Sequence, residues 1–256
     1  MDIKSINLIK KKNIMDIDKF IYRTISWQNF RDFFNITIFK YFVTWFAIFP
    51  IAAKILEKIP NEVNIPFDNV IYTITIGLPF KWQILWFASL SFVFAYILYV
   101  CCVPKFITKY FNYKYYKEYE HSPRNLVYEA HNLIKSKTDL EKFVERMLEK
   151  KYIKPVDSNS EVTNKPYVGE KQTILIFNHN SINYELALPI LDDSGNEHKG
   201  NTIIAQREIY WEIFGRLSAC KVGVRITIFI LLVISLIAFL IPFGQSICSG
   251  IQYFIK

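Results

Sequence analysis

The chain has 256 residues, of which 52% are hydrophobic and 17% aromatic, and its mean hydropathy is +0.15. This balance is unusual for a water-soluble domain and favours a membrane protein. The net charge of +8 fits cytoplasmic loops that face anionic lipid better than it fits nucleic-acid binding. The four cysteines have no repeated spacing and no histidine at zinc-ligand offsets, which argues against a disulfide framework or a structural zinc site.

Residues 1–35 form a basic, amphipathic N-terminal segment. Between residues 13 and 34 the apolar side chains recur mostly every three or four positions, with Lys19, Arg23 and Arg31 between them. The pattern predicts a helix that lies in the bilayer interface and buries its aromatic face in lipid. The alternative is a helix packed on the cytoplasmic domain.

Three apolar segments predict three transmembrane helices. Residues 82–103 carry no charge and would extend about 33 Å as a helix, which matches a hydrocarbon core of about 30 Å. Residues 225–243 are uncharged after Arg225. Residues 36–56 span only if Lys40 and Lys54 extend to the two interfaces, and Pro50 is expected to kink that helix.

Two short segments are predicted to lie outside the membrane. Residues 57–81 form an outer loop around the extended run VIYTITI. A potassium-type pore loop is the disfavoured alternative, because Pro79 stands where the second glycine of such a filter is required. Residues 244–256 form an outer tail that is too short for another crossing.

Residues 104–224 predict a cytoplasmic α+β domain. Ser122 and Pro123 start one helix, and a Thr138–Glu141 capping box starts another. Strands are expected at residues 173–177 and 202–205, which would pair with each other, followed by a helix at 206–218. A helix would begin near Asn183 only if the polar residues 178–181 serve to cap it, and residues 155–171 are expected to form a loop or mobile linker.

Lysine and aromatic residues alternate in the stretch 105–119, directly after the second predicted span. The rings suit the headgroup layer and the lysines suit lipid phosphate. Stacking on single-stranded nucleic acid is the alternative. The pattern predicts an interfacial, lipid-facing site formed by Lys105, Lys109, Tyr110, Tyr113 and Tyr116.

No nucleophile elbow, phosphate loop, thiol pair or metal-ligand cluster is present at diagnostic spacing. We therefore predict no enzyme activity, no catalytic residue, no cofactor and no metal site. Polar side chains after the strand at 173–177 predict a site for docking a partner or ligand, formed by Asn178, His179, Asn180 and Glu185. Catalysis with His179 as base and Glu185 as its orienting group is the alternative, and helix capping is the purely structural one.

Basic residues near the span ends predict an N-terminus inside, the domain inside and a C-terminus outside. This architecture of three spans, a compact cytoplasmic domain and a basic composition resembles small transmembrane effectors of bacterial anti-phage systems, including those that accompany retron reverse transcriptases. The resemblance rests on architecture and on no motif. It implies an inner-membrane homo-oligomer that docks a cytosolic protein or ribonucleoprotein and perturbs the bilayer. A non-conducting anchor or scaffold is the alternative, and a membrane-bound enzyme is a third.

Overall fold

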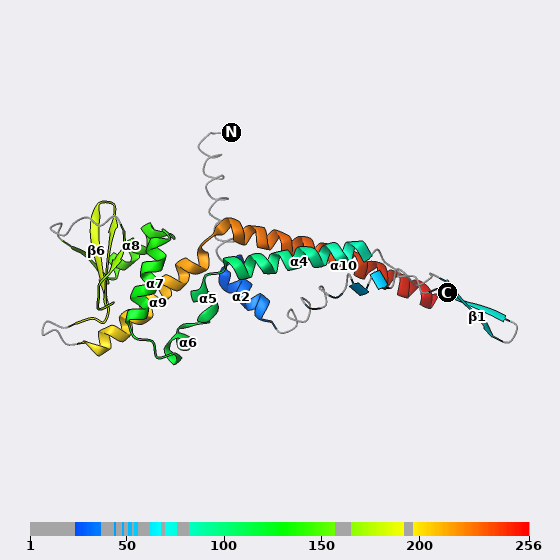
Figure 1. Cartoon of the computed structure of the whole chain (residues 1–256), viewed down its shortest axis with the longest axis horizontal. Helices are drawn as coiled ribbons and strands as arrows, with labels where there is room; N and C mark the ends of the chain where they lie inside the picture. Colours follow the sequence, from blue (N-terminus) through cyan, green and yellow to red (C-terminus); the bar gives the residue numbers. More distant parts are fainter. Residues whose placement is uncertain are drawn as a thin grey trace, which may run out of the picture. The chain divides into compact units, whose positions relative to one another are not determined.

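A computed structural model describes residues 24–36, 62–67, 70–75, 82–156, 165–191 and 197–255, together with residues 44, 48, 51, 52, 54 and 55. This part of the chain is mostly helical and contains a four-stranded sheet and a separate two-stranded hairpin (Figure 1). The chain divides into two compact units. We call residues 1–25, 29–102 and 222–256 the helical unit, and residues 26–28 and 103–221 the α+β unit.

Two long apolar helices form the centre of the helical unit. α4 (Trp82–Cys102) and α10 (Val222–Ile255) run antiparallel, side by side (Figure 1). Both are long and apolar enough to cross a membrane. Large side chains such as Phe94 and Leu236 are exposed on their outer faces. The helices predicted at residues 82–103 and 225–243 are therefore confirmed, and they are candidate membrane spans.

Small residues line the contact between α4 and α10. Ala88 and Ala95 are fully buried, which lets two helix backbones approach closely. Ser235 of α10 donates a hydrogen bond from Oγ to the carbonyl oxygen of Ala88 on α4, at 2.8 Å. Ser89 donates to the carbonyl of Leu85 in its own helix, at 2.9 Å. Both hydroxyls are thus satisfied inside protein.

α10 continues far beyond the predicted span. No break separates the predicted outer tail at residues 244–256 from the predicted span, because the helix runs through Pro242 and Gly244 to Ile255. Apolar residues such as Ile247 and Ile251 follow the glycine, and a glycine costs a helix only about 1 kcal/mol. The 34 residues of α10 extend about 51 Å. A helix of that length must tilt or project from a hydrocarbon core of about 30 Å.

α2 (Trp27–Asn35) is the described end of the predicted amphipathic helix, and residues 1–23 lie outside the described residues. Within the helical unit its Phe34 ring lies 4.8 Å from the ring of Tyr99 on α4 and 5.4 Å from that of Tyr96, measured between centroids. Phe30 and Phe34 are buried by protein. The rings of α4 therefore cover Phe34 in place of the bilayer interface, which corrects the interfacial interpretation for this residue.

The predicted first span at residues 36–56 lies largely outside the described residues. The few residues described there are helical, but they do not define a span. The third crossing therefore stays a prediction. In the outer loop, β1 (Glu62–Phe67) pairs antiparallel with β2 (Val70–Thr75), and Glu62 stands opposite Thr75. The β-branched run that predicted an extended chain thus forms half of a hairpin.

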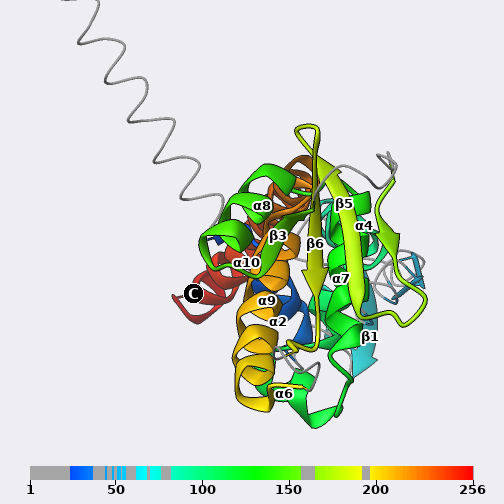
Figure 2. The ribbon, with the colours of Figure 1, turned by 90° about the vertical axis from the view of Figure 1, so that its left-hand side faces the viewer.

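The α+β unit contains an antiparallel sheet in the order β3-β6-β5-β4. The strands are β3 (Ile153–Val156), β4 (Tyr167–Val168), β5 (Ile174–His179) and β6 (Ile182–Ala187). Helices α7 (Arg124–Lys135) and α8 (Leu140–Glu149) contact the strands, and α9 (Lys199–Ala219) packs on both helices (Figure 2). The core between sheet and helices includes Leu126, Phe143, Met147, Leu175, Phe177, Leu186 and Ile213.

The strand predicted at residues 173–177 is confirmed as β5, but its predicted partner is wrong. β6 occupies the residues near Asn183 at which the helix-capping alternative would start a helix, and it follows β5 through the two-residue turn Asn180-Ser181. Both turn residues have positive φ, 50° and 65°, as a tight hairpin turn of this twist requires. A short apolar run does not by itself distinguish strand from helix.

Residues 202–205 are helical and not a strand. They belong to α9, in which Thr202 and Ala205 are buried while Ile203 and Ile204 are exposed, a helical and not an alternating pattern. His198 caps the helix because its Nδ1 accepts a hydrogen bond from the backbone N–H of Asn201, at 3.2 Å. The helix predicted at 206–218 is confirmed as the rest of α9.

Two further local predictions are corrected. Thr138 forms no capping box, because Asp139 holds the N-cap position of α8 and Thr138 Oγ1 lies 2.7 Å from Ser136 Oγ. The segment predicted as a loop at residues 155–171 contains the end of β3 and the short strand β4. The helix expected at Pro123 does form, as α7.

Replacing Ser235 with Ala should weaken the contact between α4 and α10, because it removes their hydrogen bond. Such bonds contribute about 0.6 kcal/mol on average between membrane helices, with a maximum near 1.7. We expect unfolding of the full chain at a lower concentration of sodium dodecyl sulfate, followed by circular dichroism. Thr227→Val is the control, because Thr227 Oγ1 is exposed and bonds only the carbonyl of Gly223 in its own helix. Equal loss in both variants would contradict the prediction.

Candidate membrane-surface site

Two short helices follow α4 directly. α5 (Lys105–Lys109) and α6 (Tyr113–Glu118) both lie in the α+β unit, and only Val103 and Pro104 separate α4 from α5. Proline ends the preceding helix and is well suited to precede a new one. Asn112 caps α6 by accepting a hydrogen bond from the backbone N–H of Tyr115, at 3.0 Å. These breaks divide the basic aromatic stretch at residues 105–119 into two short helices.

The tyrosines that the sequence predicted to face lipid point into the protein. Tyr110 is 1% exposed and Tyr116 is 3% exposed, and Tyr113 is half-buried. The Tyr110 hydroxyl lies 2.7 Å from Nε2 of His121, and the Tyr116 ring lies 5.2 Å from that of Tyr210 on α9. Burial raises the pKa of Tyr116 to about 12. A ring enclosed by protein cannot also lie among headgroups, so the prediction is wrong for Tyr110 and Tyr116.

A different set of aromatic rings is exposed along the same stretch of chain. Phe111, Tyr115 and Tyr119 are 39%, 49% and 54% exposed. They recur every four residues, and the Phe111 and Tyr115 rings lie 5.7 Å apart. The sequence analysis missed these three residues. Only Tyr115 lies within α6, because Phe111 precedes that helix and Tyr119 is its C-cap, so helical spacing in the sequence does not identify this set.

The lysines of the stretch lie where the sequence predicted, on the surface. Lys105 and Lys109 are exposed, as are Lys114 and Lys117. The ammonium of Lys109 lies 5.1 Å from the ring centroid of Tyr110 and 5.5 Å from that of Tyr119. The contact with Tyr110 raises the pKa of Lys109, so this cation stays charged at neutral pH.

We call Phe111, Tyr115, Tyr119 and the four lysines the α5–α6 surface. It combines exposed rings with mobile cations, which is the chemistry that binds the headgroup layer of an anionic membrane. Each lysine near such a surface is worth about 1 kcal/mol. Because only Val103 and Pro104 lie between the two helices, at most about 11 Å of extended chain joins the end of α4 to the beginning of α5.

The predicted docking residues come together only in part. Asn178 donates from Nδ2 to Oδ1 of Asn183 across the β5–β6 hairpin, at 2.9 Å, and Asn180 is exposed in the turn. His179 stands opposite Ile182, whereas Glu185 stands opposite Ile176. Since side chains alternate between the faces of a sheet, His179 and Glu185 lie on opposite faces. The catalytic alternative, in which one orients the other, is therefore excluded.

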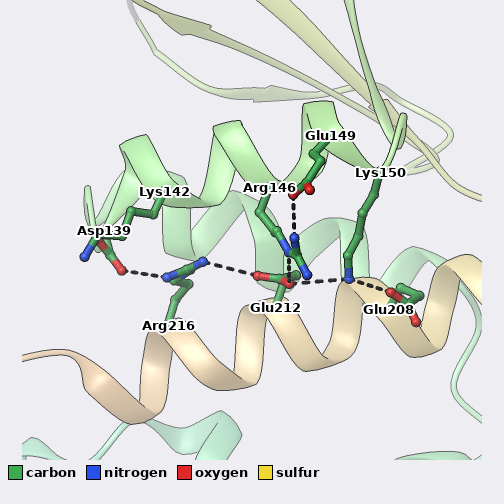
Figure 3. Close-up of polar contacts among 8 residues, drawn as sticks. All are labelled: Asp139, Lys142, Arg146, Glu149, Lys150, Glu208, Glu212 and Arg216. Carbon is green, nitrogen blue, oxygen red and sulfur yellow. Dashed lines mark hydrogen bonds and ion pairs between the residues drawn. The ribbon is translucent and has the colours of Figure 1, made fainter. Parts of the chain in front are cut away.

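The largest group of charges joins α8 to α9 (Figure 3). Its centre is Glu212, whose carboxylate lies 3.4 Å from Arg146 Nε, 3.4 Å from Lys150 Nζ and 3.3 Å from Arg216 Nη2. The group also includes Asp139, Lys142, Glu149 and Glu208. Every charge drawn there has an opposite partner, so the group ties two helices together and leaves no reactive side chain in excess.

Among the described residues, no cluster of three or more histidine, cysteine or acidic side chains could hold a metal ion. No family model, curated protein or solved structure matches this chain. Function is therefore inferred from the contacts, burial and charge of its own residues.

A label at Tyr115 should contact the membrane surface when the full chain is in vesicles that contain phosphatidylglycerol. We would convert Tyr115 to Cys in a background whose four native cysteines are Ser, attach a nitroxide, and measure collisions with nickel carried on lipid headgroups. If the α5–α6 surface binds the membrane, residue 115 lies among headgroups, so frequent collisions are expected. Tyr128→Cys is the control, because Tyr128 is also exposed but lies on α7. Equal collision rates at both sites would contradict the α5–α6 surface.

Replacing Lys150 with Met should reduce the acid sensitivity of the α+β unit. The hydrogen bond from Lys150 lowers the pKa of Glu208 below its usual value near 4.5. A carboxyl with a lowered pKa contributes stability above that value and loses it as the pH falls through the folded pKa. The wild type should therefore lose about 1 kcal/mol or less more than the variant between pH 6 and pH 3, since both groups are partly exposed.

Thermal unfolding at several pH values measures this difference, with Lys151→Met, an exposed neighbour, as the control. If the acid sensitivity of Lys150→Met and Lys151→Met were the same, the pairing with Glu208 would not set the pH dependence.

Proposed function

We propose that this chain is an integral membrane effector that acts on the bilayer as a homo-oligomer. In this proposal residues 36–56, α4 and α10 cross the membrane, and the α+β unit docks a cytosolic protein or ribonucleoprotein. The observation that supports it best is the pairing of α4 and α10, which places small residues such as Ala88 and Ala95 inside and large apolar side chains outside. Hydrocarbon is the one solvent that suits those outer faces.

Oligomerisation is part of the proposal because one helix pair offers no route for water or ions. Along the described part of α4 and α10 the buried hydroxyls of Ser89 and Ser235 bond to carbonyl oxygens inside the pair. No charged side chain lies between Gln83 and Cys102. A conducting path needs polar groups along its wall. Any effect on permeability must therefore come from several copies or from rearranged helices.

The same observation favours a second candidate, a membrane anchor that holds the α+β unit at the bilayer without conductance. A closed, satisfied helix pair is sufficient for anchoring. The two candidates differ in one measurable property, the membrane potential of cells that contain the protein.

For the biological setting we propose the bacterial inner membrane and defence against phage, with the N-terminus and the α+β unit in the cytoplasm and the C-terminus in the periplasm. The defence setting follows from the resemblance in architecture alone. The orientation follows from the distribution of lysine and arginine near the span ends.

Induced expression of the full chain in a bacterium should collapse the membrane potential reported by a voltage-sensitive dye. High protein concentration favours association by mass action, even without the partner. Ala95→Trp should abolish the effect, because Ala95 is fully buried in the helical unit and cannot accept an indole without separating the helices. Val100→Trp, at an exposed position of the same helix, is the matched control and should depolarise like the wild type.

An intact potential and normal growth at full expression would overturn the effector and leave the anchor. Alkaline carbonate extraction of the same cells tests membrane integration separately, and release of the protein into the soluble fraction would exclude both. Labelling of Cys248 by a membrane-impermeant maleimide in intact cells tests the orientation. Reaction only after permeabilisation would reverse it.

A further inference from the structure

The helical unit contains an apolar cavity of about 490 Å³. α2 and α10 supply most of its wall, and Phe92 of α4 closes the back. The apolar lining residues are Phe30, Phe33, Phe92, Phe229, Leu232, Val233, Leu236 and Phe239, and the polar ones are Thr24, Asn29 and Ser235, whose hydroxyl already bonds the carbonyl oxygen of Ala88. The volume lies within the range of small-molecule sites in proteins, about 300 to 1,000 Å³.

The cavity follows α10, which contributes six of its lining residues. Its residues on that helix run from Phe229 to Phe239, and four of them recur at three- and four-residue steps and mark one stripe about 15 Å long: Phe229, Leu232, Leu236 and Phe239. Phe30 and Phe92 are buried at its floor, whereas Val233 and Leu236 are exposed at its rim. The stripe is therefore open to whatever medium surrounds α10.

The two ends of the stripe differ in chemistry. Thr24 and Asn29 lie at one end, and the amide of Asn29 donates to the carbonyl oxygen of Thr24 at 3.0 Å. The guanidinium of Arg225, one turn before Phe229, donates to the carbonyl oxygen of Ile25 and fixes this segment beside the beginning of α10. Phe239 lies at the opposite, apolar end. The cavity thus has a polar mouth and a hydrocarbon-like channel.

We propose that this cavity binds one acyl chain, with the carboxyl or ester group at Thr24 and Asn29 and the methyl end toward Phe239. The proposal rests on the proposed membrane integration of α10, where acyl chains are the surrounding medium. Water does not suit the site, because a bound water needs two to four polar partners and the channel beyond the mouth offers apolar side chains. A polar head with one long apolar tail matches both ends at once.

An acyl chain in this position would contact α2 and α10 together. Because α2 is only nine residues long, it depends on tertiary contacts for its stability. Occupancy of the cavity therefore stabilises α2 against α10, and the lipid becomes a structural component of the helical unit.

The test uses photo-crosslinking of the purified full chain in nanodiscs. One arm uses stearic acid with a diazirine at the chain end, and the other uses phosphatidylglycerol with the same group on one acyl chain. Saturable labelling of α2 or of residues 229–239, competed by unlabelled stearic acid or phosphatidylglycerol, is expected. Labelling by the fatty acid alone identifies a free acid as the ligand, and labelling in both arms identifies a membrane lipid.

Leu232→Trp and Leu236→Trp fill the cavity and should reduce the saturable labelling by about tenfold, which corresponds to about 1.4 kcal/mol of binding free energy. Ile237→Trp is the matched control, because Ile237 is as exposed as its neighbour Leu236, at 56% against 57%, and does not line the cavity. It should label like the wild type. Circular dichroism and size exclusion show that each variant keeps its fold.

Equal labelling in Leu236→Trp and Ile237→Trp would overturn the site, since the label would then report bulk lipid. Crosslinks from this stripe to a second copy of the chain, in place of lipid, would also overturn it. If the wild-type protein resists carbonate extraction but shows no saturable labelling, the acyl-chain site is wrong and the proposed membrane integration stands. If carbonate releases the protein into the soluble fraction, membrane integration, and with it the proposed function, is wrong.

Discussion

The close approach of α4 and α10 is the constraint on which the helical unit depends. Two uncharged helices gain little from hydrophobic burial when the surrounding medium is itself apolar, so packing and hydrogen bonding must hold them together. Ala88 and Ala95 provide the close packing, and the bond from Ser235 to the Ala88 carbonyl fixes the register. Bulkier side chains at these positions would part the helices, and the cavity beside Phe92 would lose its back wall.

The division of aromatic residues around α5 and α6 connects the two proposed interactions with lipid. Tyr110 and Tyr116 build the core of the α+β unit with Tyr210, whereas Phe111 and Tyr115 remain outside. A single short stretch thus serves both as core and as surface. The stretch follows a candidate span after only two residues of chain.

The remaining charges of the α+β unit have a structural explanation. The Glu212 carboxylate forms ion pairs with three cations, Arg146, Lys150 and Arg216. Without this carboxylate the three positive charges would face one another. The network explains why so charged a helix pair can pack without a reactive group in excess.

How much of the fold could be predicted depended on the length of each pattern. α4 and α10 follow from uncharged runs, because no soluble structure accommodates such runs easily. β5 follows from a dense apolar segment with turn residues after it. The sequence did not predict that residues 182–187 form a strand or that residues 202–205 form part of a helix, because runs of four to six apolar residues fit a strand and a buried helix face equally well. Pairing with β5 makes the first segment a strand, and capping by His198 starts the helix that contains the second.

The candidate site divides in the same way. The sequence by itself determined that lysines and aromatic rings gather after α4, because composition and adjacency to an uncharged helix are local properties. Only the tertiary structure decided which rings face outward, since this depends on where α9 presents Tyr210. It also placed His179 and Glu185 on opposite faces of the sheet, because the register of β5 with β6 is a contact between strands and not a property of either strand alone.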